Sequence, residues 1–185
     1  IEGRLVHSWN SLYKPGNSVY LEADGTLLHT GNPGDGASQI FAGGAGGVVE
    51  ELDWEGNRIW QFSYISDDVR AHHDVERLPS GNLLIVAWET KTRAEAIQAG
   101  CDPGYVSQDG LWPDHVIEVD RDQNIVWEWH VWDWLGTEPD RFDINFWVSV
   151  PWGWKDWTHG NTVEYNEATD EMIVNFRNWG EFYII

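Results

Sequence analysis

The sequence predicts an all-β protein, a β-propeller of four-stranded antiparallel blades, of which about three are present in these 185 residues. Three observations predict this fold. Two families of hairpins alternate along the chain, their turns carry pairs such as Asp-Gly and Ser-Gly, and tryptophan recurs at the ends of strands. Such self-similarity with regular turn punctuation is typical of propellers.

The first family consists of three segments that superimpose without gaps. They read EGRLVHSW (2–9), EGNRIWQF (55–62) and DQNIVWEW (122–129), and each is a turn followed by an alternating strand that ends in an aromatic residue. The segments GVVEELDW (47–54) and DHVIEVDR (114–121) come just before the second and third copies. Each of these pairs predicts one hairpin.

The second family supplies the other two strands of each unit. Its members are NSVYLEADGTLLHTG (17–31), HDVERLPSGNLLIVA (73–87) and NTVEYNEATDEMIVNF (161–176), each a strand, a short turn and an apolar strand. Two hairpins per unit give four strands, which we letter A to D from the propeller axis outward. We therefore expect residues 1–185 to form a single partial propeller, with 1–9 as the outer strand of a preceding blade, 17–62 and 71–129 as blades, and 159–185 as an incomplete blade.

A closed propeller needs four to eight blades. We expect either that the chain is a fragment of a longer protein, whose remaining blades close the ring, or that copies of it associate as a homo-oligomer.

The long connections all fall on one side of the predicted blades. The stretches 30–47, 88–113 and 130–157 link strands B to C or D to A, whereas the A–B and C–D turns are short. One face is therefore elaborated, and function is expected there because loops on a rigid scaffold carry it. Within the second stretch, residues 90–100 predict one short helix with Thr90 or Thr92 as its N-cap and a glycine just past its end.

Composition excludes several classes of partner. The chain has 31 acidic and 11 basic side chains and a formal charge of −20, which argues against nucleic acid and against an anionic membrane surface. No stretch approaches 18 apolar residues, so we expect no membrane insertion. One cysteine permits no internal disulfide. Fourteen tryptophans exceed what one core needs, so some are expected to line a binding surface.

Polar side chains gather where the inner strands begin. Alternation puts His159 and Asn161 on one side of a strand start, and the antiparallel partner strand ends at Arg177 on the same level. In the preceding blade the equivalent start carries His72 and His73, which must point to opposite sides; we expect His73 to face the axis. The first blade has Asn17 there.

This ring would be neutral to cationic on a strongly acidic protein, which suits an anion. A propeller histidine can equally serve only to hold loops together by hydrogen bonds, and that alternative stays open for each one. No metal site is expected, because adjacent histidines do not share a strand face and no cysteine accompanies them. The sequence carries no phosphate-binding loop, nucleophile elbow or dinucleotide fingerprint.

The segment WTHGNTVEYN…DEMIVNFRNWGEFYII resembles the arylsulfate sulfotransferase family, in which a Trp-Thr-His-x-Asn strand is followed by a strand ending in arginine. The segments HHDVERLPSGNLLIVAWETKTRAEAIQAGCDP, LWPDHVIEVD and IVWEWHVWDWL are also similar to members of that family, so the likeness covers most of the chain. The resemblance implies a six-bladed propeller that moves a sulfuryl group from an aryl sulfate donor to a phenolic acceptor. It implies no cofactor, a ping-pong mechanism through a sulfated histidine, and a periplasmic or extracellular location.

The resemblance also implies roles for residues. His159, Arg177 and His73 would be catalytic, and Asn161, His72 and Asn17 would bind substrate. Tryptophans of the elaborated face would stack the aromatic rings of donor and acceptor: Trp112 and Trp157 above all, and with them Trp132, Trp134, Trp147, Trp152 and Trp154. The family's sulfated histidine lies in a later blade, so these 185 residues alone are expected to be inactive.

Two other functions compete with this interpretation. The first is a non-catalytic propeller that binds aromatic or sulfated ligands or acts as a scaffold. The second is a quinone-cofactor propeller, which the tryptophan-rich repeats faintly resemble.

Overall fold

Three antiparallel sheets make up the described part of the chain, residues 2–34, 36–146 and 155–185, in this computed structural model. The all-β class and the blade-like sheets are confirmed. The strands run in chain order within each sheet: β1 (Lys14–Leu21), β2 (Leu27–Asn32), β3 (Val48–Leu52) and β4 (Arg58–Ser63); then β5 (Val69–Arg77), β6 (Leu83–Glu89), β7 (Asp114–Val119) and β8 (Ile125–His130); then β9 (Gly160–Asn166), β10 (Glu171–Phe176) and β11 (Glu181–Ile184).

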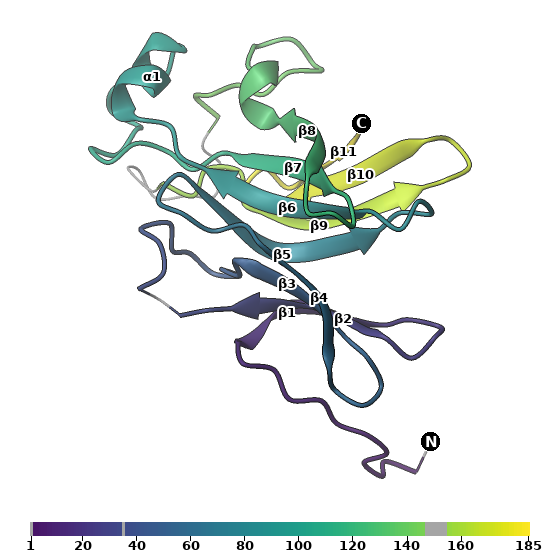
Figure 1. Cartoon of the computed structure of the whole chain (residues 1–185). Coiled ribbons are helices and arrows are strands. Elements are labelled where there is room, and N and C mark those ends of the chain that lie inside the picture. The colour runs from purple at the N-terminus through teal and green to yellow at the C-terminus, as the bar shows by residue number, and fades with distance from the viewer. Residues whose placement is uncertain (1, 35, 147–154) are drawn as a thin grey trace.

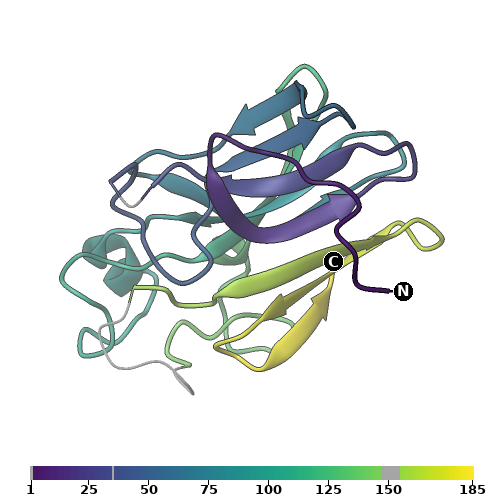
Figure 2. The same ribbon diagram turned by 90° about the horizontal axis from the view of Figure 1, so that it is seen from below.

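The sheets fan out from their first strands, as Figures 1 and 2 show. One carboxylate joins these three inner strands. Asp74 on β5 accepts a hydrogen bond from the hydroxyl of Tyr20 on β1 at 2.6 Å and one from the backbone nitrogen of Val163 on β9 at 3.3 Å. Because Asp74 is buried, its carboxylate needs these donors, and they fix the three inner strands relative to one another.

The core lies between the sheets, and the middle sheet is buried on both faces. Alternate residues of β6 point in opposite directions, so Leu83 and Ile85 pack toward the first sheet while Leu84 and Val86 pack toward the third. This explains why β6 reads as a continuous apolar run rather than an alternating one.

An ionic clamp also ties the first sheet to the second. Glu51 on β3 is 2% exposed. It accepts hydrogen bonds from Arg77 on β5 at 2.7 Å and from Arg121 in the β7–β8 turn at 2.7 Å. Burial alone would raise the pKa of Glu51, but the two arginines outweigh it and hold that pKa below its ordinary value.

The connections differ in length as the sequence predicts. The turns between β1 and β2, β5 and β6, and β9 and β10 are short and lie at the right of Figure 1. Long segments separate β2 from β3, β6 from β7 and β8 from β9. The second contains α1 (Arg93–Gln98), where Thr92 is the N-cap and forms a capping box with Glu95. The third contains the short 3-10 helix η1 (Val131–Trp134).

Residues 2–9 form no strand, which corrects their expected place as an outer strand. Leu5 and Val6 are 86% and 87% exposed, and no described strand lies beside them to complete a ladder. The segment instead rests on the β3–β4 turn, where the ring of His7 stacks on Trp54 and Trp9 donates a hydrogen bond to the carbonyl oxygen of Asp53. Strand propensity alone does not form a strand without a partner.

Among the described residues, no helix combines the length and the apolar character that crossing a bilayer requires.

Candidate functional site

An open cleft of about 430 Å³ lies along the three inner strands β1, β5 and β9. Its walls include Asn17 from β1, His73 from β5 and Asn161 from β9. These are the equivalent positions of the three repeats, so the structure brings together the side chains that the repeat alignment placed at the strand starts.

Two histidines beside the cleft share an uncommon backbone conformation. His73 and His159 have φ values of 49° and 57°, in the left-handed region. Each lies at an irregularity in its ladder, His73 within a bulge between Ala71 and Val75 and His159 immediately before β9. The bulge turns His73 out of the regular alternation, and its imidazole centroid lies 4.8 Å from that of His159.

His72 does not line the cleft, which corrects its expected contact with substrate. It is 1% exposed, and its ring stacks on Trp88 with the centroids 3.7 Å apart. Its Nδ1 lies 2.8 Å from Nδ1 of His73, and its Nε2 lies 2.7 Å from Oδ1 of Asp114, with the ring N–H out of line with that oxygen. His72 therefore touches the site only through His73.

His159 is held by a carboxylate on its own loop. Its Nδ1 forms a short hydrogen bond with Oδ2 of Asp156, and the other oxygen of Asp156 accepts a hydrogen bond from the indole nitrogen of Trp88 at 3.0 Å. Asn178 secures the loop by donating to the backbone carbonyl of Asp156 at 2.9 Å. The imidazole of His159 is therefore fixed through Nδ1.

Arg177 follows β10 and is exposed. Its backbone nitrogen donates to the carbonyl oxygen of His159 at 3.0 Å. Its positive charge reaches the cleft: burial lowers the pKa of His73 to about 3, and the neighbouring rings of His72 and His159 and the charge of Arg177 contribute to the decrease. The imidazole of His73 and the carboxamides of Asn17 and Asn161 therefore line one cleft, the ring of His159 lies beside His73, and Arg177 is joined to His159 through its backbone.

The two tryptophans expected to bind substrate have core positions instead. Trp157 is 0% exposed and packs against Trp179. Trp112 is buried against Ile40 and Trp88, with the ammonium of Lys155 over its ring. Their rings already contact protein on all sides, so neither has a free face for stacking a substrate.

The other tryptophans of the elaborated face divide into two groups. Trp132 and Trp134 each have a cation over the ring, from Lys91 and Arg141 respectively. Trp147, Trp152 and Trp154 lie outside the described residues.

Sequence reasoning missed Trp88, Asp114 and Asp156, which support the histidines. One signal for Trp88 was available, because it ends the second strand of its repeat just as Phe176, beside Arg177, ends the second strand of the last repeat. Asp114 begins β7, and its carboxylate accepts a short hydrogen bond from the hydroxyl of Thr158. Burial raises the pKa of Asp114 to about 6, despite the hydrogen bonds from Thr158 and Gly160 that favour its charged form.

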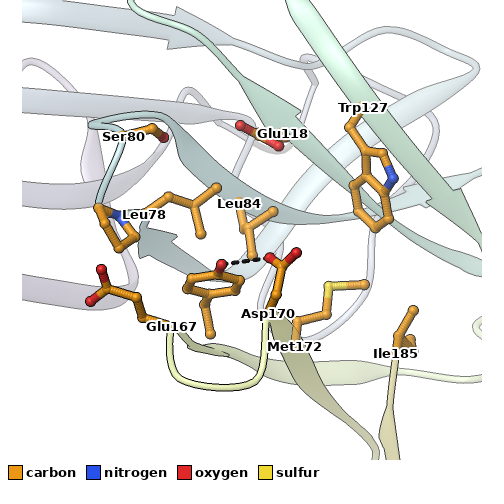
Figure 3. Close-up of a pocket in the computed structure, with 11 residues that line it drawn as sticks. Leu78, Ser80, Leu84, Glu118, Trp127, Glu167, Asp170, Met172 and Ile185 are labelled. Carbon is orange, nitrogen blue, oxygen red and sulfur yellow. Dashed lines mark hydrogen bonds between the residues drawn. The ribbon is translucent and has the colours of Figure 1, made fainter.

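A second pocket lies on the opposite side, between the β5–β6 and β9–β10 turns, and Figure 3 shows its lining. Leu84, Met172 and Trp127 form its apolar part, and three carboxylates surround them: Glu118, Glu167 and Asp170. Its lining contains no basic side chain. Because like charges repel, the three carboxylates of this pocket do not suit a sulfate ester.

The described residues contain no group of three or more His, Cys, Asp or Glu side chains placed to hold a metal ion.

Comparison with known proteins agrees with this chemistry. The family model described as Arylsulfotransferase (ASST) matches residues 17–180. The chain belongs to the arylsulfotransferase family. The match spans all three sheets, from β1 to the β10–β11 turn, and includes every histidine, asparagine and arginine predicted for the site. No curated protein sequence matches the chain.

Membership of the arylsulfotransferase family gives the coarse function, the transfer of sulfuryl groups between aryl sulfates and phenols. The physical demands of that reaction are clear. A sulfuryl group spreads negative charge over its oxygens, by analogy with phosphoryl transfer, so catalysis needs fixed donors around those oxygens and a neutral base for the acceptor. The cleft itself is lined by the carboxamides of Asn17 and Asn161, the imidazole of His73 and the carboxylate of Asp74.

Proposed function

We propose that the protein transfers a sulfuryl group from an aryl sulfate donor to a phenolic acceptor by a ping-pong mechanism, with His159, Arg177 and His73 as the catalytic residues of the cleft. The observation that carries the proposal is the pair of imidazoles of His73 and His159, whose centroids lie 4.8 Å apart beside the cleft, with the positive charge of Arg177 acting on His73.

Each group has a task in this proposal. Arg177 offers its fork of N–H donors to two sulfate oxygens, and Asn161 donates its amide to a third. His159 contributes its Nε2, because its Nδ1 is bound by Asp156. Asn17 lines the opposite wall and contacts the aromatic part or the acceptor.

The covalent step splits one displacement into two. In the first, a histidine nitrogen bonds to sulfur while the ester S–O bond breaks and the phenolate leaves with its electron pair. In the second, the acceptor oxygen bonds to sulfur, the N–S bond breaks, and the acceptor's proton passes to a base. The family resemblance assigns the sulfated histidine to a later blade, so the residues described here bind and neutralise the group in transit.

The test uses the full-length gene product with p-nitrophenyl sulfate labelled in the sulfate and with phenol as acceptor. We expect release of p-nitrophenol that depends on phenol, and label retained on histidine when phenol is omitted. Saturable binding without release would instead support a non-catalytic ligand-binding propeller, and neither binding nor release would overturn both functions.

A further inference from the structure

Three polar groups in close contact lead from the interior to the cleft. Asp114 contacts Nε2 of His72 at 2.7 Å, Nδ1 of His72 contacts Nδ1 of His73 at 2.8 Å, and His73 lines the cleft. The first two groups are fully buried and the third is half-buried. Nε2 of His73 has no hydrogen bond with any described residue.

The positions of the protons follow from which atoms face one another. Asp114 is ionised at neutral pH, because its pKa is about 6, and an ionised carboxylate can only accept. A bare Nε2 of His72 would set its lone pair 2.7 Å from this oxygen, so Nε2 of His72 carries a proton, although its N–H is out of line with the oxygen. Burial lowers the pKa of His72 to about 3, so its ring is neutral and its Nδ1 is bare. A bare Nδ1 accepts, so His73 must donate from its own Nδ1, and this leaves Nε2 of His73 without a proton.

We propose that Asp114 and His72 are positioning residues that hold the proton of His73 on Nδ1, so that the bare Nε2 of His73 takes the proton of the acceptor phenol. This role rests on the proposed function, whereas the assignment of protons does not. As the acceptor oxygen bonds to sulfur, its O–H proton moves to Nε2 of His73 and the electron pair of the N–S bond returns to the sulfated histidine. The cation formed on His73 is favoured by the charge of Asp114 and opposed by Arg177, and the rings of His72 and His159 face it.

Trp88 joins this line to the one that orients His159. Its ring stacks on His72, and its indole nitrogen binds Asp156, which in turn binds Nδ1 of His159. Because the carboxylate of Asp156 holds a proton on Nδ1 of His159, Nε2 of His159 carries no proton whenever that ring is neutral. His73 and His159 thus adopt the same tautomer, with the proton on Nδ1. Asp114, acting through His72, fixes the first ring, and Asp156 fixes the second.

The first experiment measures tautomers directly, by long-range ¹H–¹⁵N NMR of the full-length protein labelled on its histidines at pH 7.5. Single His→Gln variants assign the signals. We expect His72 with its proton on Nε2 and His73 with its proton on Nδ1. A proton on Nε2 of His73 would overturn the proposal whether or not the protein transfers sulfuryl groups.

The second experiment uses Asp114→Asn, whose amide can donate to Nε2 of His72 and reverse both tautomers. Because p-nitrophenolate leaves without needing a proton, we expect the burst of the first half-reaction to persist while turnover with phenol falls about a hundredfold or more, as expected when a supporting carboxylate is lost. The control is Asp109→Asn, an exposed carboxylate paired with Lys155. Equal loss of burst and turnover would contradict a role confined to the acceptor step. If Asp114→Asn does not fold, the NMR spectra of the wild-type protein still show whether His73 carries its proton on Nδ1.

If the wild-type protein shows the expected tautomers but no sulfuryl transfer, only the proposed function is contradicted. If it transfers sulfuryl groups but His73 carries its proton on Nε2, only the positioning role of Asp114 and His72 is contradicted.

Discussion

The backbone nitrogen of Arg177 donates a hydrogen bond to the carbonyl oxygen of His159 at 3.0 Å. This bond joins the end of β10 to the residue before β9, so the side chains of Arg177 and His159 start from fixed neighbouring points. A guanidinium and an imidazole that are positioned by the same backbone contact can bind the same ligand without separate ordering of each loop.

Arg177→Lys keeps the charge but removes the two-pronged donor. We expect turnover in the full-length protein to fall at least about tenfold, which corresponds to about 1.4 kcal/mol in transition-state stabilisation. The measurement is p-nitrophenol release with phenol as acceptor, and Arg4→Lys, on the exposed N-terminal segment, is the control. A wild-type rate for Arg177→Lys would remove this residue from the site.

Gly44→Ala tests the position of His73. A Cβ at residue 44 would lie 2.0 Å from Cε1 of His73, and the backbone there has a φ of 84°. The ring must move, and a displacement of this kind is expected to lower turnover by about tenfold to a hundredfold and to reduce stability by about 1–3 kcal/mol. Gly43→Ala is the matched control, because a Cβ there has no atom within 4 Å. Equal behaviour of the two variants would contradict the predicted packing.

Acid should destabilise the fold below about pH 6.5. Burial lowers the pKa of His72 and of His115 to about 3, so the unfolded chain binds protons that the folded chain excludes. As the pH decreases from about 6.5 toward 3, the free energy of unfolding decreases by up to about 1.4 kcal/mol per pH unit for each histidine. Asp114, whose pKa is raised, offsets part of this loss below pH 6.

Urea midpoints at pH 7.5 and pH 5.5 measure the effect, with His7→Gln as a control at the exposed N-terminal segment. A midpoint that did not move between the two values would contradict the neutral, buried state of His72 and His115.

Glu51→Ala should destabilise the protein by at least about 2 kcal/mol, because it removes hydrogen bonds between charged groups from a buried site and leaves Arg77 and Arg121 without their shared acceptor. Urea unfolding checks this, against Glu55→Ala at the exposed tip of the β3–β4 turn. Since Glu51 is buried, the difference should persist in high salt. Equal midpoints for the two variants would show that the clamp contributes nothing.

Much of the fold could be predicted because it depends on local pattern. The hairpins follow from alternation and turn residues, and the capping box of Thr92 with Glu95 follows from their spacing. Residues 2–9 were mispredicted because a strand exists only beside another strand.

The site was harder to predict because side-chain direction depends on irregularities that sequence does not mark. Alternation predicts that His72 and His73 point to opposite sides, but the bulge in β5 and the left-handed backbone of His73 bring their Nδ1 atoms to 2.8 Å and decide how the ring of His73 meets His159. Burial also could not be predicted. The sequence suggests that Trp157 stacks on a substrate, but Trp157 lies in the core. Nothing in the strand pattern marks Trp88, which supports His72 by stacking and His159 through Asp156.

The short turns at the right of Figure 1 lie on the side away from α1 and the long connections. A fluorophore or an affinity handle grafted at residues 79–81 would therefore leave entry to the histidine cleft unobstructed, and surface immobilisation through that edge would present the cleft to solution.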